Sequence, residues 1–198
     1  PLAEPGIIGV SSGAGFFTII MILFFPTMFF YAPLFSFIGG AIAFLLVYMF
    51  AWKSGLDPLR MILIGVAINA VFTGLSQLLS AQNPSSMMTG ISVTTSTLTM
   101  KTWNDVEIIV WYGAIGLILS MLFFPWCNHL GLKDKTLRNL GFHVNRARFI
   151  ISVIAVLLAS IATAIAGMFT FVGLLIPHIG RILVGNDHKY LIPFSAIA

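Results

Sequence analysis

The chain has 198 residues, of which 59% are hydrophobic and only 8% are charged, and its formal net charge is +4. Soluble domains carry roughly 25% charged residues, so this chain has too few charges to cover a soluble surface. Intrinsic disorder is excluded as well, because it requires low hydrophobicity. The composition therefore predicts a polytopic protein surrounded by membrane lipid. The positive charge is interpreted through its placement along the chain and not as affinity for nucleic acid.

Several apolar stretches are long enough to cross a bilayer core of about 30 Å as helices. In chain order they are 16–30 (which the segment 9–15 can extend), 34–52, 59–81, 106–126 and 149–169, then a short stretch at 171–184 and an opening stretch at 190–198. Helices are expected because lipid leaves every backbone polar group to be satisfied internally. Barrel strands would alternate polar and apolar residues, and these stretches do not. We therefore expect an all-α fold.

Charge divides the connections between these stretches into two sets that alternate along the chain. The basic set comprises 52–60, 127–148 and 181–190, and the nearly uncharged set comprises 26–33, 81–105 and 167–173. Of the 10 Lys and Arg residues, only Lys101 falls in the second set. By the positive-inside rule the basic set is cytoplasmic.

The stretch 59–81 differs from the others because polar residues follow one face of it. Gly65, Asn69, Thr73, Ser76, Gln77 and Ser80 recur every three to four residues. Amides at membrane depth are costly unless they are paired or hydrated. Two interpretations stay open: hydrogen bonds between helices, or a translocation path for a polar solute lined by Asn69, Thr73, Ser76 and Gln77. No ionisable residue lies deep in the second to fifth stretches, which argues against an ion-coupled carrier.

The connection 81–105 is rich in Ser and Thr, and Met87 and Met88 lead into Thr89 and Gly90. A short re-entrant helix or a plain polar loop fits this segment. Our hypothesis is that residues 87–90 form an outer gate.

The longest basic connection contains an amphipathic segment at 130–141. Leu132, Thr136, Leu137 and Leu140 can share one face of a helix that Gly141 ends. An isolated helix this short is marginal in water, so we expect it to dock on membrane headgroups or on a cytoplasmic protein.

Catalytic signals are weak. Gly9 to Gly13 satisfies G-x-S-x-G, but a nucleophile elbow needs a strand before it, so a dyad of Ser11 and His178 is the lesser interpretation. The four histidines lack zinc-ligand spacing, and the lone Cys127 excludes an internal disulfide. The run from Cys127 to His129 is interpreted as incidental. We expect no metal, cofactor or catalytic residue.

Pro177, His178 and Arg181 are expected to be structural, because His178 and Arg181 can pair with each other, with the 131–141 segment or with Asp187. No G-x-x-x-x-G-K-[ST] phosphate loop is present, so energy for uphill transport has to come from another subunit.

Five segments carry a resemblance to a known family. They are 1–14 (PLAEPGIIGVSSGA), 60–67 (RMILIGVA), 130–141 (LGLKDKTLRNLG), 167–181 (GMFTFVGLLIPHIGR) and 187–193 (DHKYLIP). In this order they resemble the motifs of FecCD-type permeases, the inner-membrane subunits of ABC importers for ferric siderophores, haem and cobalamin. The Thr-rich outer segment, around 98–103, is more similar to the haem-uptake permeases of Gram-positive bacteria.

The resemblance implies a ten-helix permease in the bacterial cytoplasmic membrane, of which residues 1–198 would be a single domain truncated at both ends. It implies cytoplasmic ATP-binding subunits, an external substrate-binding protein and a second permease copy, identical or paralogous. A coupling segment at about 129–146 would meet the ATPase. The matching coupling positions are Gly131, Leu132, Thr136, Leu137, Arg138, Leu140 and Gly141. The less favoured alternatives are an ion-coupled carrier and an intramembrane Ser/His hydrolase.

Overall fold

The computed structural model describes residues 9–52, 58–82, 101–131, 134–139, 141–168 and 172–197. Its elements are α1 (Val10–Phe24), η1 (Pro26–Tyr31), α2 (Ala32–Trp52), α3 (Pro58–Gln82), α5 (Trp103–Leu122), α6 (Phe124–His129), α7 (Asp134–Asn139), α8 (Val144–Ala166), α9 (Val172–Val184) and α10 (His188–Ile197). None of the described residues lies in a strand, which confirms the all-α prediction.

Four helices are long and apolar enough to cross a membrane. They are Ala32–Ala51, Ile62–Ala81, Trp103–Leu122 and Arg146–Ala166, and the apolar helices α1 and α9 are shorter. These four match the second to fifth predicted spans, with ends that differ by a few residues. The prediction of a polytopic membrane protein is therefore confirmed.

The first predicted span, 16–30 with its possible extension through 9–15, is wrong at its C-terminal end. Helix α1 begins at Val10, within the extension, but it ends at Phe24 instead of continuing to residue 30. The residue before a proline is pushed out of the helical region, and Phe25, which precedes Pro26, has φ −134° and ψ 58°. The segment predicted to be helical beyond Phe24 is instead the separate 3₁₀ turn η1.

The fourth predicted span, 106–126, is shifted for two local reasons. Asp105 accepts hydrogen bonds at Oδ2 from the backbone N–H of Thr102 at 2.7 Å and from its hydroxyl at 2.9 Å, so the helix begins earlier, at Trp103. Near the other end, Pro125 lies at the start of α6, and the chain bends at Phe123 between the two helices.

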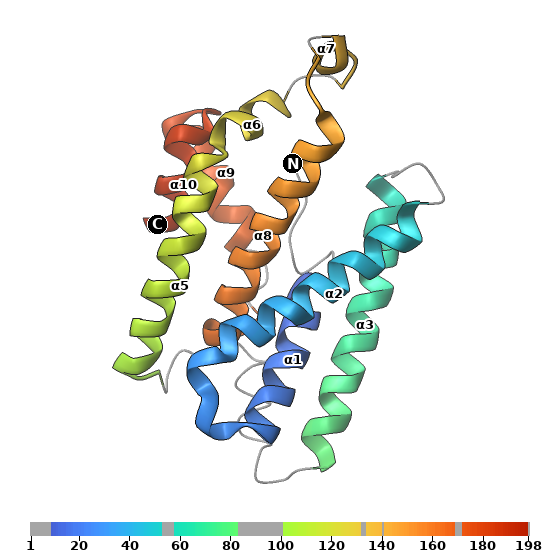
Figure 1. The fold of residues 1–198 in the computed structure, drawn as a ribbon, viewed down its shortest axis with the longest axis vertical. Coiled ribbons are helices and arrows are strands. Elements are labelled where there is room, and N and C mark those ends of the chain that lie inside the picture. Colours follow the sequence, from blue (N-terminus) through green and yellow to red (C-terminus); the bar gives the residue numbers. More distant parts are fainter. Residues whose placement is uncertain are drawn as a thin grey trace.

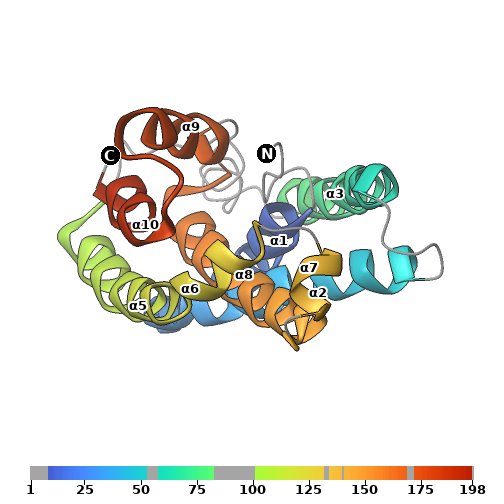
Figure 2. The ribbon, with the colours of Figure 1, turned by 90° about the horizontal axis from the view of Figure 1, so that it is seen from above.

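Helix α1 lies at the centre, where it contacts α2, α3 and α8, while α5 packs on α8 and α9 pairs with α10 (Figure 1). Seen from above, α3 lies at one side and the α9–α10 pair at the other (Figure 2). Gly39 and Gly40 serve two different interfaces of α2: a β-carbon at Gly39 would meet α1, and one at Gly40 would meet Ser160 of α8. Figure 1 shows α6 and α7 together at the upper end of the molecule.

Candidate functional site

The polar residues of α3 lie on the flank between its packed face and its exposed face. Gly65, Ile68, Phe72 and Ser76 are buried, and α3 contacts α1 and α2. Asn69 and Thr73 are half-buried, whereas Gln77 is exposed. At about 100° per residue, these three side chains lie successively farther around the helix from the buried face. The stripe therefore runs from the helix interface out to the open side.

Hydrogen bonds distinguish the members of this stripe. The Ser76 hydroxyl donates to the backbone oxygen of Phe72 at 2.8 Å, so its polar group is satisfied within α3. The Thr73 hydroxyl lies 3.5 Å from Asn69 Oδ1, which is a long contact. Gln77 makes no hydrogen bond to another residue that the structure describes. Of the four predicted path residues, Asn69, Thr73 and Gln77 keep polar groups available on the open flank.

The N-terminal end of α1 lies in close contact with α3 beside this polar stripe. Gly9 has φ +79°, and a β-carbon there would lie 3.1 Å from the Gly65 carbonyl oxygen and 3.3 Å from the Asn69 backbone nitrogen. Glycine is favoured on both counts, because the left-handed conformation strains a residue with a side chain and a β-carbon would lie in tight contact with the backbone of α3. The predicted outer-gate residues Met87, Met88, Thr89 and Gly90 lie outside the described residues.

The predicted coupling helix is short and ends where the sequence predicts. Helix α7 covers Asp134–Asn139, and Gly141 follows it with φ +77°. The backbone N–H of Phe142 donates to the carbonyl oxygen of Leu137 at 3.0 Å, the long C-terminal bond of a Schellman motif. The end at Gly141 is thus confirmed, with glycine supplying the left-handed residue.

The residues predicted to couple to the ATPase divide into buried and exposed positions. Leu137 is only 2% exposed where α7 meets α8, whose Val144 and Ala147 are also buried. Thr136 and Gly131 are exposed, as is Gly141. Leu132 and Leu140 lie outside the described residues, and so does the side chain of Arg138. Leu137 therefore anchors α7 to the chain itself, and Thr136 is accessible to a partner.

A cluster joins α6 to the start of α10. Asn128 Nδ2 donates to Asp187 Oδ1 at 2.8 Å, and Asn128 Oδ1 accepts from the His188 backbone N–H at 3.0 Å and lies 2.7 Å from His188 Nδ1. The Lys189 backbone N–H also donates to Asp187 Oδ1, at 3.0 Å. Hydrogen bonds from Lys189 N–H and Asn128 lower the pKa of the Asp187 carboxyl. Burial, and then the positive charge of Arg181, lower the pKa of His188.

The predicted pairing of His178 or Arg181 with Asp187 is not seen among the described residues, where Asp187 Oδ1 instead accepts from Asn128 and from the Lys189 backbone N–H. His178 and Arg181 are exposed on α9, and Pro177 lies within the same helix. The interpretation of Asn128 as incidental is wrong, because its side chain joins α6 to α10. The DHK motif was a signal for one side of the cluster, but nothing near Asn128 marked it as the partner of residues 59 and 60 positions away.

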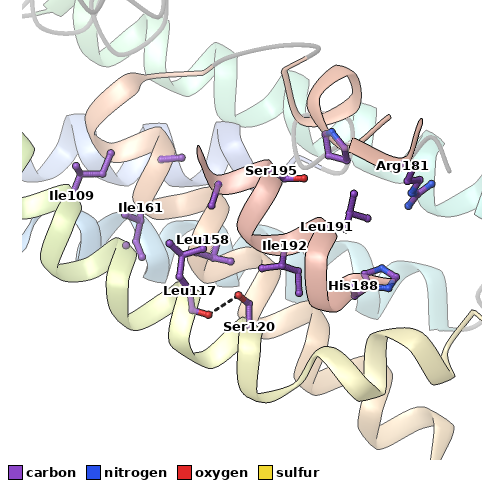
Figure 3. Close-up of a pocket in the computed structure, with 14 residues that line it drawn as sticks. Ile109, Leu117, Ser120, Leu158, Ile161, Arg181, His188, Leu191, Ile192 and Ser195 are labelled. Carbon is purple, nitrogen blue, oxygen red and sulfur yellow. Dashed lines mark hydrogen bonds between the residues drawn. The ribbon is translucent and has the colours of Figure 1, made fainter. Parts of the chain in front are cut away.

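A cavity of about 550 Å³ lies between α5, α8, α9 and α10, with Arg181 and His188 at one end and Ile109 at the other (Figure 3). Its lining is mainly apolar and includes Leu117, Leu158, Ile161, Leu191 and Ile192. Ser120 donates to the Leu117 backbone oxygen at 2.8 Å, and the Ser195 hydroxyl is buried without a partner in the described part of the chain.

Neither a metal-binding cluster nor a hydrogen-bonded Ser–His pair is found among the described residues. They contain no group of three His, Cys, Asp or Glu side chains able to hold a metal ion. Ser11 and His178 lie on α1 and α9, and no hydrogen bond joins them there.

Comparisons with known proteins agree along the whole chain. A model described as the FecCD transport family matches residues 1–198. The chain is 42% identical over 197 residues to the heme-iron transport system permease protein IsdF of Staphylococcus aureus strain Newman, covering 100% of this chain and 59% of that protein. The same values hold for the IsdF protein of strain USA300.

A solved structure, described as an inward-facing conformation of a metal-chelate type ABC transporter, matches with a TM-score of 0.82 and 26% identity, over 98% of this chain and 63% of that one. The chain therefore spans about three-fifths of the length of the proteins that it matches.

Proposed function

The chain belongs to the FecCD transport family, and on that premise we propose that it is part of the transmembrane permease subunit of an ATP-driven importer for an iron complex. The observation that carries the proposal is the match of nearly the whole helical arrangement to a metal-chelate type ABC transporter at a TM-score of 0.82. The 42% identity to a protein named for heme-iron transport favours haem, ahead of a ferric siderophore or cobalamin.

In the proposed mechanism the solute passes along the open flank of α3. Asn69, Thr73 and Gln77 offer neutral hydrogen-bonding groups there. Neutral groups of this kind hold a polar solute weakly, and weak interactions suit a conduit because tight binding would trap the cargo. Affinity then belongs to an external substrate-binding protein, and the outer gate at 87–90 stays a prediction.

Energy is proposed to enter from the cytoplasmic side through α6 and α7. The sequence has no phosphate-binding loop, so ATP hydrolysis is assigned to separate ATP-binding subunits. The exposed Thr136 gives those subunits a place to bind beside the buried anchor Leu137. A second permease copy, identical or paralogous, would complete the pore, and rigid-body movement of the helices would alternate the access.

Uptake measurements test this function. Deleting the gene for the full-length protein should abolish uptake of haem, and uptake should return with the intact gene only when the ATPase subunit retains its catalytic residues. Several ferric siderophores serve as parallel substrates. Uptake that persists without a functional ATPase would instead indicate an ion-coupled carrier. A Ser11→Ala variant with full uptake would exclude the hydrolase alternative.

A further inference from the structure

Both the nitrogen and the oxygen of the Asn128 side chain take part in fastening α6 to α10. Its amide nitrogen donates to Asp187 Oδ1 at 2.8 Å, and its oxygen lies 3.0 Å from the His188 backbone nitrogen and 2.7 Å from His188 Nδ1. The three partners are 59 or 60 residues away in sequence. One side chain therefore joins two elements that the chain itself connects only through α7, α8 and α9.

Chemistry fixes the orientation of this amide. A carboxylate can only accept and a backbone N–H can only donate, so the Asn128 NH₂ has to face Asp187 and its oxygen has to face His188. In the flipped orientation the Asn128 oxygen would face the Asp187 carboxylate, and the Asn128 NH₂ would face the His188 backbone N–H. For the same reason His188 Nδ1 carries a proton. Aspartate at position 128 has the same shape but would bring two carboxylates together.

The contact also completes the N-terminus of α10. The first N–H groups of a helix have no partner within it. Asp187 precedes the helix and accepts from the Lys189 N–H, as capping residues do. The remaining His188 N–H is satisfied by Asn128, which acts as a cap supplied from another helix.

Helix α10 is in turn packed tightly on α9. A β-carbon at Gly180 of α9 would lie 2.8 Å from Leu191 and 3.1 Å from Phe194 of α10. Helix α10 also contacts α5 and α6, and Figures 1 and 2 show α6 beside the start of α10. Helix α7, the proposed ATPase contact, follows α6 in the chain and packs on α8, so a displacement of that segment can pass to α8 directly and to α10 through α6 and Asn128.

We propose that Asn128 is a positioning residue which makes α6, α9 and α10 move as one unit during transport, so that movement of the coupling segment is passed directly to α10. This inference rests on the proposed function. In this proposal the Asn128–Asp187–His188 cluster transmits movement from the coupling segment to α10, in addition to stabilising the fold.

An exchange of the two side chains tests the proposal in the full-length permease, assembled with its ATPase and reconstituted in vesicles, with haem as the substrate. Asn128→Ala and Asn128→Asp should each lower haem uptake about tenfold while ATP hydrolysis changes less than about twofold. Asp187→Asn keeps the one oxygen that accepts from Asn128 and from the Lys189 N–H, and should transport normally. The double variant Asn128→Asp with Asp187→Asn reverses the direction of the hydrogen bond and should restore at least about half of the uptake. Asn104→Ala, an exposed amide on α5, is the matched control.

The amount of haem taken up per ATP hydrolysed distinguishes a residue that transmits movement from one that only stabilises the fold. A merely structural cap would lower uptake and hydrolysis together, so a parallel loss overturns the proposal, as does normal uptake by Asn128→Ala or a double variant that stays inactive. Both readouts are ratios to the wild-type transporter. Failure of the proposed function would appear in the wild type itself and is therefore distinguishable.

A covalent link gives an independent measurement. Cysteines at positions 128 and 187, in a Cys127→Ser background, remove the hydrogen bonds and should lower uptake per ATP. Joining them with a short bifunctional thiol reagent should restore it, because the link replaces the lost contact. Uptake that stays low or falls further after crosslinking would show that α6 and α10 separate during transport, which contradicts the proposal.

Discussion

Gly39 of α2 lies directly against Gly13 of α1, so that a β-carbon at Gly39 would collide with the Gly13 carbonyl oxygen and lie 2.7 Å from the Phe17 side chain. A β-carbon at Gly13 would in turn lie 2.6 Å from that of Ala43. Close approach through small residues is how helices associate in lipid, where burial of apolar surface gives little driving force. This contact holds α1, which also carries the Gly9 junction with α3, in its central place.

Gly39→Ala should therefore destabilise the folded chain. The nearest atoms include backbone, which cannot move aside as a flexible side chain can, so we expect a loss of about 1–3 kcal/mol in the free energy of unfolding. Gly74→Ala on α3 is the matched control, since a β-carbon there meets nothing within 4 Å. Thermal denaturation in detergent measures both. Equal midpoints for the two variants would contradict the close contact.

The fold was largely predictable because membrane helices are determined by hydropathy and charge, which are local and visible in the sequence. The ends of the helices were less predictable than their existence. Helix α1 ends at Phe24 because of Pro26, and α5 starts at Trp103 because Asp105 caps it. Thr102 and Asp105 have the spacing of a capping box, but the predicted start was placed from hydropathy alone. Tertiary contacts were not predictable, and Asn128 shows why. Its partners are fixed by how α6 is placed against α10, which no local pattern specifies.

The candidate site was predictable in part for the same reason. Helical periodicity identified the polar stripe of α3, and glycine chemistry identified the end of α7 at Gly141. The amphipathic pattern of the coupling segment could not say which of its residues the chain itself covers. The structure shows that Leu137 is covered and that Thr136 is not.

The polar flank of α3 predicts a graded reactivity toward water-soluble thiol reagents. Cysteines at Thr73 and Gln77 should react readily, and a cysteine at Phe72, which is 8% exposed, should react much more slowly. Labelling would be measured on the full-length protein in membranes with Cys127 replaced by Ser, although burial already raises the pKa of the Cys127 thiol and lowers its reactivity. Comparable labelling at all three positions would show that this flank is not a water-filled path.

Neighbouring residues of α7 should have different roles. Thr136→Asp changes an exposed position and should weaken association with the ATPase subunit while leaving the thermal midpoint of the permease unchanged. Leu137→Asp buries a charge and should lower the free energy of unfolding by at least about 2–3 kcal/mol. Both the thermal midpoint and the association with the ATPase subunit should therefore fall. Co-purification of the ATPase and thermal denaturation measure the two effects. If Thr136→Asp retains the ATPase fully, the exposed face of α7 is not the contact.

The Asn128 cluster predicts that acid weakens the junction of α6 and α10. Both Asp187 and His188 have lowered pKa values in the folded chain, so the folded state binds fewer protons than the unfolded state, and stability falls as the pH falls. The His188 contribution is complete above the ordinary histidine value of about 6.5 and is lost as the pH drops through the lowered folded value. The contribution of the exposed Asp187 is lost only below its ordinary value of about 3.9.

Between pH 7.5 and pH 5 the change therefore comes from His188. His188→Asn places a non-titrating donor where Nδ1 lies, so the thermal midpoint of this variant should fall less over that range than the wild-type midpoint. Denaturation scans of both proteins at a series of pH values, in one detergent, make the comparison, and the other three histidines are present in both. Identical pH dependence in the two proteins would mean that His188 does not have the lowered pKa on which this prediction depends.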